Sequence, residues 1–274
     1  MSKKLLITGA CGRFFQTCVS LYSTTCNMQT EHDTIMLEYN MTEGQKSFIK
    51  EAFGAKVIHY EKMLDHARQF TLFTHIAYAK YECFNLLSEY EQVLWLDNDT
   101  ICTGKVDGIF SFNKGFVARY EHELSYEFKE PPEIFKELLK KNPKTKGFNA
   151  GVSLFNRGIP NLTEECYATT IAQGANAVLA DQGVLNLVMA LNSITVVDLP
   201  MEFNNTTCGW WENFSCRLSS ARGQTAILHF AGPQKPWDKL EKGWIFTEIV
   251  DIWNSWSERA LKQYPEIKSL SMQA

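Results

Sequence analysis

Two carboxylates separated by one residue follow an apolar run in the middle of the chain. Residues 93–96, Val-Leu-Trp-Leu, form an apolar run led by a β-branched residue, which predicts a strand buried on both faces. Asp97 and Asp99 come next, at the edge of a sheet where ligands bind. Carboxylates this close repel one another unless a cation lies between them, and a divalent metal that holds phosphates is the expected occupant. The alternative is a solvated turn, because Asp and Asn favour turns and helix caps.

Further polar residues begin or end predicted elements later in the chain. Asn149 lies at a small-residue entry to a strand, Asp181-Gln182 open a helix, and His229 ends the last strand, with Lys235 beyond it. Taken singly, Asp181 fits a helix N-cap, His229 a core histidine and Lys235 a surface lysine. Taken together they predict a site. Two carboxylates and a neutral imidazole bind a metal of the Mn²⁺ or Mg²⁺ type, the lysine supplies charge for a diphosphate, and Asn149, Asp181 and Gln182 serve sugar hydroxyls and the reacting carbon.

The elements that must position these residues alternate between strands and helices. This order implies parallel strand pairing with right-handed crossovers, and hence an α/β fold. The predicted order in the first part of the chain is strand 4–8, helix 14–24, strand 34–37, helix 44–53 and strand 56–59.

A long amphipathic helix is predicted at 69–89, leading into the strand that ends at Asp97. It carries Lys80, which the pattern places on the exposed face. The charged, proline-containing segment 121–146 resembles an insertion over the mouth of an active site more than core. The remaining elements are predicted as strands at 115–118, 152–156, 195–199 and 226–230, helices at 133–140, from Asp181 and at 244–262, and an aromatic loop at 203–217.

The turn after the first strand, Gly9-Ala10-Cys11-Gly12, lets a backbone approach a nucleotide closely. It is neither Gly-x-Gly-x-x-Gly nor a P-loop, so the specific dinucleotide-binding and kinase interpretations fail.

Composition narrows the class of protein further. The chain has 274 residues, a formal net charge of −4 and a sequence pI near 5.9, which argue against nucleic acid as a partner. Its eight cysteines include no Cys-x-x-Cys pair and no disulfide framework, so they are interpreted as mostly buried thiols in a reducing compartment. There is no signal-peptide core and no apolar run of membrane-spanning length. The sequence therefore predicts a cytoplasmic protein.

The order of these motifs resembles that of glycosyltransferase family 8. The similarity extends over about residues 3–240, and its most specific part is the pattern His229-x-x-Gly232-x-x-Lys235-Pro-Trp. The resemblance implies a GT-A fold in a single domain, 1–274, with the catalytic core at 1–240 and a helical tail at 241–274. Such a domain is Rossmann-like and binds a nucleotide sugar, with a mixed, mostly parallel central sheet and helices on both faces. The matching stretches are Leu96-Asp97-Asn98-Asp99-Thr100, Phe148-Asn149-Ala150-Gly151-Val152, Asp181-Gln182-Gly183-Val184-Leu185-Asn186 and His229 to Trp237.

The resemblance also assigns roles by position. Asp97, Asp99 and His229 are implied as ligands of Mn²⁺, with Mg²⁺ as the alternative. Asn149, Asp181 and Gln182 match donor-sugar and catalytic positions. The first loop departs from relatives, which often carry Asp or Asn there. The contacts implied for the nucleotide sugar are Thr8, Gly9 and Ala10 at uracil and ribose, Phe14 nearby, Lys80, Gly232 and Lys235 at the phosphates, and Asn98, Asn149, Ala150 and Gly151 beside them.

The implied activity is a metal-dependent, retaining transfer of a hexose, glucose or galactose, from a UDP-sugar to a glycan or protein acceptor. Asp181 or Gln182 acts as a nucleophile, or the acceptor attacks on the leaving-group side; both routes stay open. A sugar nucleotidyltransferase is an alternative, although it would want a Gly-rich basic loop that residues 9–13 only faintly provide. A second alternative is a nucleotide-sugar-binding relative that has lost activity. Against this alternative, every implied metal and phosphate position holds a residue able to make that contact. Self-glycosylation, dimerisation and a peripheral membrane contact through the tail also stay open.

Overall fold

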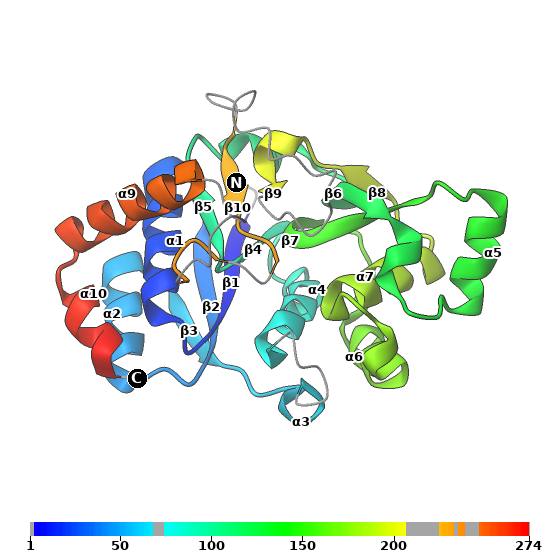
Figure 1. The fold of residues 1–274 in the computed structure, drawn as a ribbon, viewed down its shortest axis with the longest axis horizontal. Helices are drawn as coiled ribbons and strands as arrows, with labels where there is room; N and C mark the ends of the chain where they lie inside the picture. Colours follow the sequence, from blue (N-terminus) through cyan, green and yellow to red (C-terminus); the bar gives the residue numbers. More distant parts are fainter. Residues whose placement is uncertain (1–2, 68–73, 207–224, 233–234, 239–246, 274) are drawn as a thin grey trace.

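A seven-stranded sheet forms the centre of the protein (Figure 1). The structure is a computed structural model that describes residues 3–67, 74–206, 225–232, 235–238 and 247–273. The strand order is β3-β2-β1-β4-β7-β6-β8, and β7 is antiparallel to both of its neighbours while the other pairs are parallel. This confirms the prediction of a mixed, mostly parallel sheet. The strands are β1 (Lys4–Cys11), β2 (Asp33–Tyr39), β3 (Lys56–His59), β4 (Gln92–Asp97), β6 (Phe116–Glu123), β7 (Lys146–Asn156) and β8 (Val196–Asp198).

The apolar runs form strands because their alternate side chains fill two separate cores. In β4, Val93 and Trp95 face one hydrophobic cluster, whereas Leu94 and Leu96 face another. All four are at most 2% exposed. A continuous apolar run therefore indicates a strand covered on both faces, as the sequence predicted.

Helices cover both faces of the sheet. On one face lie the 3₁₀ helix η1 (His75–Tyr81), α4 (Glu82–Leu86), α6 (Thr163–Gln173) and α7 (Ala180–Leu191). On the other, α9 (Thr247–Gln263) and α10 (Glu266–Leu270) pack around α1 (Phe14–Asn27), beside α2 (Glu43–Phe53) (Figure 1). The other helices among the described residues are α3 (Leu64–Ala67), α5 (Glu133–Lys141) and the 3₁₀ turns η2 (Asp107–Ser111), η3 (Leu124–Glu127), η4 (Gly174–Asn176), η5 (Met201–Phe203) and η6 (Ser271–Gln273).

A small second sheet lies beside the carboxyl end of β4. Its order is β5-β10-β9, formed by β5 (Thr100–Cys102), β10 (Ile227–His229) and β9 (Asn205–Thr206). β10 runs antiparallel to β5 and pairs His229 with Thr100. The sequence predicted β10 but neither β5 nor β9.

The single helix predicted at 69–89 is wrong for the described part of that segment. From residue 75 the chain forms a 3₁₀ helix and then the short α4. Nearly every side chain from His75 to Phe84 is buried, so the segment lacks the exposed face of an amphipathic helix. The expectation that Lys80 is exposed is also wrong, because its side chain is 3% exposed.

Segment 121–146 contributes to the core, contrary to the expected insertion. β6 continues to Glu123, and Leu124, Glu127 and Phe135 are buried. The predicted helix within it is confirmed as α5, at the far edge of the view in Figure 1. The aromatic loop, by contrast, falls mostly outside the described residues.

Among the described cysteines all six are free thiols, and Cys18, Cys83, Cys102 and Cys166 are buried. Cys208 and Cys216 lie outside the described residues. No helix in the described part of the chain combines the length and hydropathy needed to cross a bilayer.

Candidate active site

Asp97, at the end of β4, and Asp99, in the turn that follows, are held where the chain passes from one sheet to the other. Asp97 is the last residue of β4 and pairs in register with Gly9 of β1. The Thr100 hydroxyl donates to the Asp97 carbonyl oxygen at 2.7 Å. The backbone N–H of Phe230 donates to the Asp99 carbonyl oxygen at 2.8 Å, next to the β5–β10 pairing. Segments 130 residues apart in sequence, Asp99 and His229, thereby come together.

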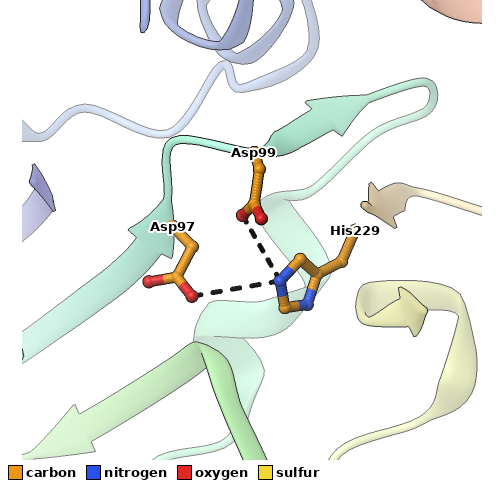
Figure 2. A group of neighbouring side chains, drawn as sticks. All are labelled: Asp97, Asp99 and His229. Atoms are coloured by element: carbon orange, nitrogen blue, oxygen red, sulfur yellow. Dashed lines mark ion pairs between the residues drawn. The ribbon is translucent and has the colours of Figure 1, made fainter. Parts of the chain in front are cut away.

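Asp97, Asp99 and His229 form a group that can hold a metal ion. Figure 2 shows both carboxylates directed toward one ring nitrogen of His229. His229 Nε2 lies 3.4 Å from Asp99 Oδ1 and 3.9 Å from Asp97 Oδ2. One ligand atom from each residue falls within 4.8 Å of the others. Two carboxylate oxygens and one imidazole nitrogen are a donor set for Mn²⁺, and the oxygens suit Mg²⁺.

Two further observations show that these residues fit a cation. Asp99 Oδ1 is buried and has no hydrogen-bond donor among the described residues, with His229 Nε2 its neighbouring nitrogen. A buried oxygen in that state is costly unless something positive satisfies it. The second observation is Gly151 in β7, which lies against the ligand atoms and leaves them room because it carries no side chain.

Gly151→Ala is expected to close the cation site. A Cβ at residue 151 would lie 2.7 Å from His229 Nε2 and 2.8 Å from Asp97 Oδ2. We expect the affinity for Mn²⁺, measured by calorimetry on the protein alone, to fall by at least about tenfold as the ligands are displaced. The matched control is Gly44→Ala, whose Cβ would make an ordinary 3.4 Å contact with Leu270 far from the site. Equal Mn²⁺ affinity in the two variants would contradict this geometry.

Lys235 lies directly beside the cation position. Its Nζ donates to Asp99 Oδ2 at 2.5 Å and to the Phe230 carbonyl oxygen at 2.6 Å. Burial acts to raise the pKa of Asp99, but the charges around it, above all the Lys235 ammonium, outweigh burial and hold the pKa well below the ordinary range. Asp99 is therefore ionised at neutral pH, as a metal ligand must be.

A buried lysine lies between Asp97 and the predicted catalytic residue Asp181. Lys80 Nζ lies 2.5 Å from Asp181 Oδ2 and 3.5 Å from Asp97 Oδ1. Burial acts to lower the pKa of Lys80, but Asp181 and Asp97 outweigh it and raise the pKa above the ordinary value. For Asp181, burial and the Asp97 charge raise the pKa, and Lys80 opposes them. The expected N-cap role of Asp181 is wrong: the cap residue of α7 is Leu179, and the Asp181 side chain turns to Lys80 instead.

Asn149 and Gln182 are both held by hydrogen bonds that fix their amides. Asn149 Oδ1 accepts from the Gly151 N–H at 3.0 Å. Gln182 Oε1 accepts from the Ala150 N–H at 3.1 Å, and its Nε2 donates to Glu127 Oε1 at 3.2 Å. The structure thus joins the Asn149 strand to the start of α7, as the predicted site requires.

Glu127, which sequence reasoning missed, lies behind Gln182. It is fully buried, and its Oε1 also accepts from Asn186 at 3.0 Å and contacts His122 Nε2 at 2.6 Å. Burial raises the pKa of Glu127 although His122 opposes the shift. Burial acts to lower the pKa of His122, but Glu127 outweighs it and raises that pKa. Nothing in the sequence around Glu127 distinguishes it from the other acidic residues of segment 121–146.

The His122–Glu127 pair predicts a pH dependence of stability. The pKa of His122 is raised in the folded protein. Its contribution to the free energy of unfolding is therefore fully present below the pKa of the unfolded state, about 6.5, and is lost as the pH rises through the folded-state pKa. The effect of Glu127 on stability changes with pH in the same direction, since its folded-state pKa is also raised. We expect His122→Gln to lower the free energy of unfolding most at low pH, with a difference from wild type that shrinks toward high pH. Urea unfolding across a pH series tests this, and a difference that grows with pH would contradict it.

A second missed residue, Trp95, orients Asp97. Its indole Nε1 donates to Asp97 Oδ1 at 2.6 Å, which leaves Oδ2 facing His229. The spacing could have revealed it, because side chains two apart on a strand share a face.

The other residues predicted to contact the nucleotide sugar differ in burial and in surroundings. Thr8 and Ala10 are buried near the end of β1, and Thr8 Oγ1 has no hydrogen-bond partner among the described residues. Asn98 is partly exposed in the turn. Gly232 has a positive φ of 93° in the loop before Lys235. Phe14 is enclosed in the core, where it packs edge-to-face on Phe48, so its contact with the nucleotide stays a prediction.

Comparison with known proteins identifies the family of the chain and its fold. The sequence profile of "Glycosyl transferase family 8" matches residues 15–241. A search of curated protein sequences gave no significant match.

Solved structures share the fold at low sequence identity. The galactosyltransferase LgtC, in complex with donor and acceptor sugar analogues, aligns with a TM-score of 0.63 and 17% identity over 92% of this chain and 95% of its own. The glycosyltransferase GlyE of Streptococcus pneumoniae TIGR4 aligns with a TM-score of 0.64 and 18% sequence identity over 98% of this chain, and the chain spans 65% of GlyE. The bifunctional glycosyltransferase WbbM aligns with a TM-score of 0.66 and 17% sequence identity over 95% of this chain, and the chain spans 51% of WbbM. The fold is GT-A, and the chain belongs to glycosyltransferase family 8.

Proposed function

We propose that the protein transfers a hexose, glucose or galactose, from a UDP-sugar to a glycan or protein acceptor, with Mn²⁺ or Mg²⁺ and with retention of anomeric configuration. The observation that carries this proposal is the convergence of Asp97, Asp99 and His229 ligand atoms within 4.8 Å, beside the Lys235 ammonium. Family membership supports glycosyl transfer; the donor-site chemistry of these residues supports a nucleotide diphosphate held through a cation.

The charges of the site match a departing diphosphate. A divalent cation held by Asp97, Asp99 and His229 would neutralise negative charge as it grows on the leaving group. Lys235 adds a second positive charge from the loop after β10. Because this ammonium is paired with Asp99 before any ligand binds, a diphosphate would receive a preorganised cation rather than a freely moving one.

The residues beyond the metal group would receive the sugar. Asn149, in β7, offers an amide whose oxygen is already engaged, so its Nδ2 remains for a sugar hydroxyl. Asp181 pairs with Lys80 at 2.5 Å, so its carboxylate is engaged by an ammonium before a sugar binds. This supports a same-face reaction in which the departing phosphate takes the acceptor proton, with Asp181 providing electrostatic stabilisation of the positively charged sugar carbon.

The stereochemical outcome tests the proposed function directly. UDP-glucose and UDP-galactose are incubated with the protein and Mn²⁺, with water standing in as acceptor, and the released sugar is followed by proton NMR. We expect turnover that stops on chelation of the metal and an α-anomer that appears first. Release of the β-anomer, or turnover that is unchanged in EDTA, would overturn the proposal. No turnover of either donor together with no binding would indicate an inactive relative.

A further inference from the structure

Asn204 links the predicted metal histidine to the predicted sugar-binding asparagine. Its Oδ1 lies 3.1 Å from His229 Nδ1, and its Nδ2 donates to Asn149 Oδ1 at 2.9 Å. The side chain is completely buried, so both contacts are shielded from water. None of the sequence motifs includes this residue.

The direction of the hydrogen bonds along this chain is set at one end by the backbone. The N–H of Gly151 can only donate, so the Asn149 atom that it contacts must be the carbonyl oxygen, Oδ1. The Asn204 atom facing that oxygen must then be a donor, Nδ2, which places Asn204 Oδ1 against His229. An amide oxygen only accepts, so His229 Nδ1 must carry a proton.

The backbone around Asn204 keeps this side chain in place. Asn204 follows η5 and precedes β9, which pairs in parallel with β10, the strand that carries His229. Arg119 Nη1 donates to the Asn204 carbonyl oxygen at 2.6 Å, and the Asn204 N–H donates to the carbonyl oxygen of Met201 at 3.1 Å. The acceptor for His229 is therefore part of a tethered segment and not a mobile side chain.

We propose that Asn204 is a positioning residue that holds the Nδ1 proton of His229 and so leaves Nε2, the nitrogen facing Asp97 and Asp99, unprotonated, with its lone pair available to a cation. The role rests on the proposed metal dependence. A ligand histidine binds a metal through one nitrogen when a partner accepts a hydrogen bond from the other, which fixes the ring orientation. Here the same amide also fixes Asn149, so the cation position and the sugar-binding amide share one support.

The first test reads the proton position in the metal-free protein. Two-bond ¹H–¹⁵N correlation spectra of ¹⁵N-histidine-labelled protein, recorded where imidazole is neutral and assigned with His229→Gln, distinguish the two tautomers. We expect wild-type His229 to be protonated on Nδ1. In Asn204→Leu, which keeps the branching at Cγ and removes the acceptor, we expect that preference to be lost. A proton on Nε2 and none on Nδ1 in the wild type would overturn the inference.

The second test measures Mn²⁺ affinity by calorimetry, without donor. We expect Asn204→Leu to weaken Mn²⁺ binding by about 10- to 100-fold, the usual cost of losing such a partner. Asn204→Asp keeps an acceptor for Nδ1 and should retain most of the affinity. The matched control is Asn205→Leu: its neighbouring, buried amide donates to Thr225 Oγ1 at 3.0 Å instead of contacting the site.

The outcomes separate this role from the proposed function. If the wild type binds Mn²⁺ and the variants Asn204→Leu and Asn205→Leu weaken that binding equally, the role of Asn204 is overturned and metal dependence stays intact. Absence of Mn²⁺ binding by the wild type would overturn the proposed function itself. The NMR result on the metal-free protein then still decides whether Asn204 sets the tautomer.

Discussion

Replacing Asp99 by asparagine is expected to reduce turnover by at least about a hundredfold and to remove Mn²⁺-dependent donor binding while the protein stays folded. The substitution preserves shape but removes the charge that faces both the cation position and Lys235. Asn also presents a weaker ligand oxygen, and it leaves the Lys235 ammonium without its carboxylate. Turnover of UDP-sugar and calorimetric titration of Mn²⁺ measure the two effects, with circular dichroism to confirm folding.

The matched control for this change is Asp33→Asn. Asp33 begins β2, at the opposite end of the parallel strands, where it pairs with Lys3 at 3.6 Å on the surface. Exposed pairs of this kind contribute little, so both turnover and metal binding should stay at the wild-type level. A folded Asp99→Asn protein with the turnover of the Asp33→Asn control would contradict the metal assignment.

Lys80→Met is expected to give the largest loss of stability among the site variants. It removes the cation between two carboxylates, Asp181 and Asp97, in a place where Lys80 is 2% exposed. Leaving a buried charge without its partner costs about 3–5 kcal/mol of unfolding free energy. Urea unfolding measures this loss. The double variant Lys80→Met/Asp181→Asn should recover much of it, because it also removes one of the unpaired charges.

Lys62→Met provides the comparison for a surface ion pair. Lys62 Nζ lies 2.8 Å from Glu82 Oε1, but the lysine side chain is 52% exposed. Its loss should cost no more than about 1 kcal/mol. If Lys80→Met were no more destabilising than Lys62→Met, the buried link that Lys80 forms between Asp97 and Asp181 would be wrong.

Much of the fold could be predicted because short-range patterns determine it. The apolar runs of β1, β2 and β4 and the polar residues that end them predicted both the sheet and the edge where the site lies. The capping residues around α2 confirm a predicted helix, with Thr42 accepting from the Gln45 N–H and Gly54 ending the helix in a left-handed conformation. Such signals are contained within a few neighbouring residues.

The misjudged parts depend on contacts between distant segments. The local pattern predicts an exposed Lys80 because it does not show that Asp181, 101 residues later, supplies a partner. Asn204 and Glu127 were missed for the same reason: each acts through one or two buried amides brought close only by the sheet. Periodicity predicts an amphipathic helix where η1 lies, because periodicity alone does not reveal that nearly all of its side chains are covered.

Calorimetric titration of UDP, with and without Mn²⁺, tests the central claim most directly, and UDP-glucose and UDP-galactose follow in the same buffers. The site described here predicts that UDP binds only when the metal is present and that one sugar nucleotide binds more tightly than the other. UDP binding of equal affinity in EDTA would contradict a site in which Asp97, Asp99 and His229 hold the diphosphate through a cation.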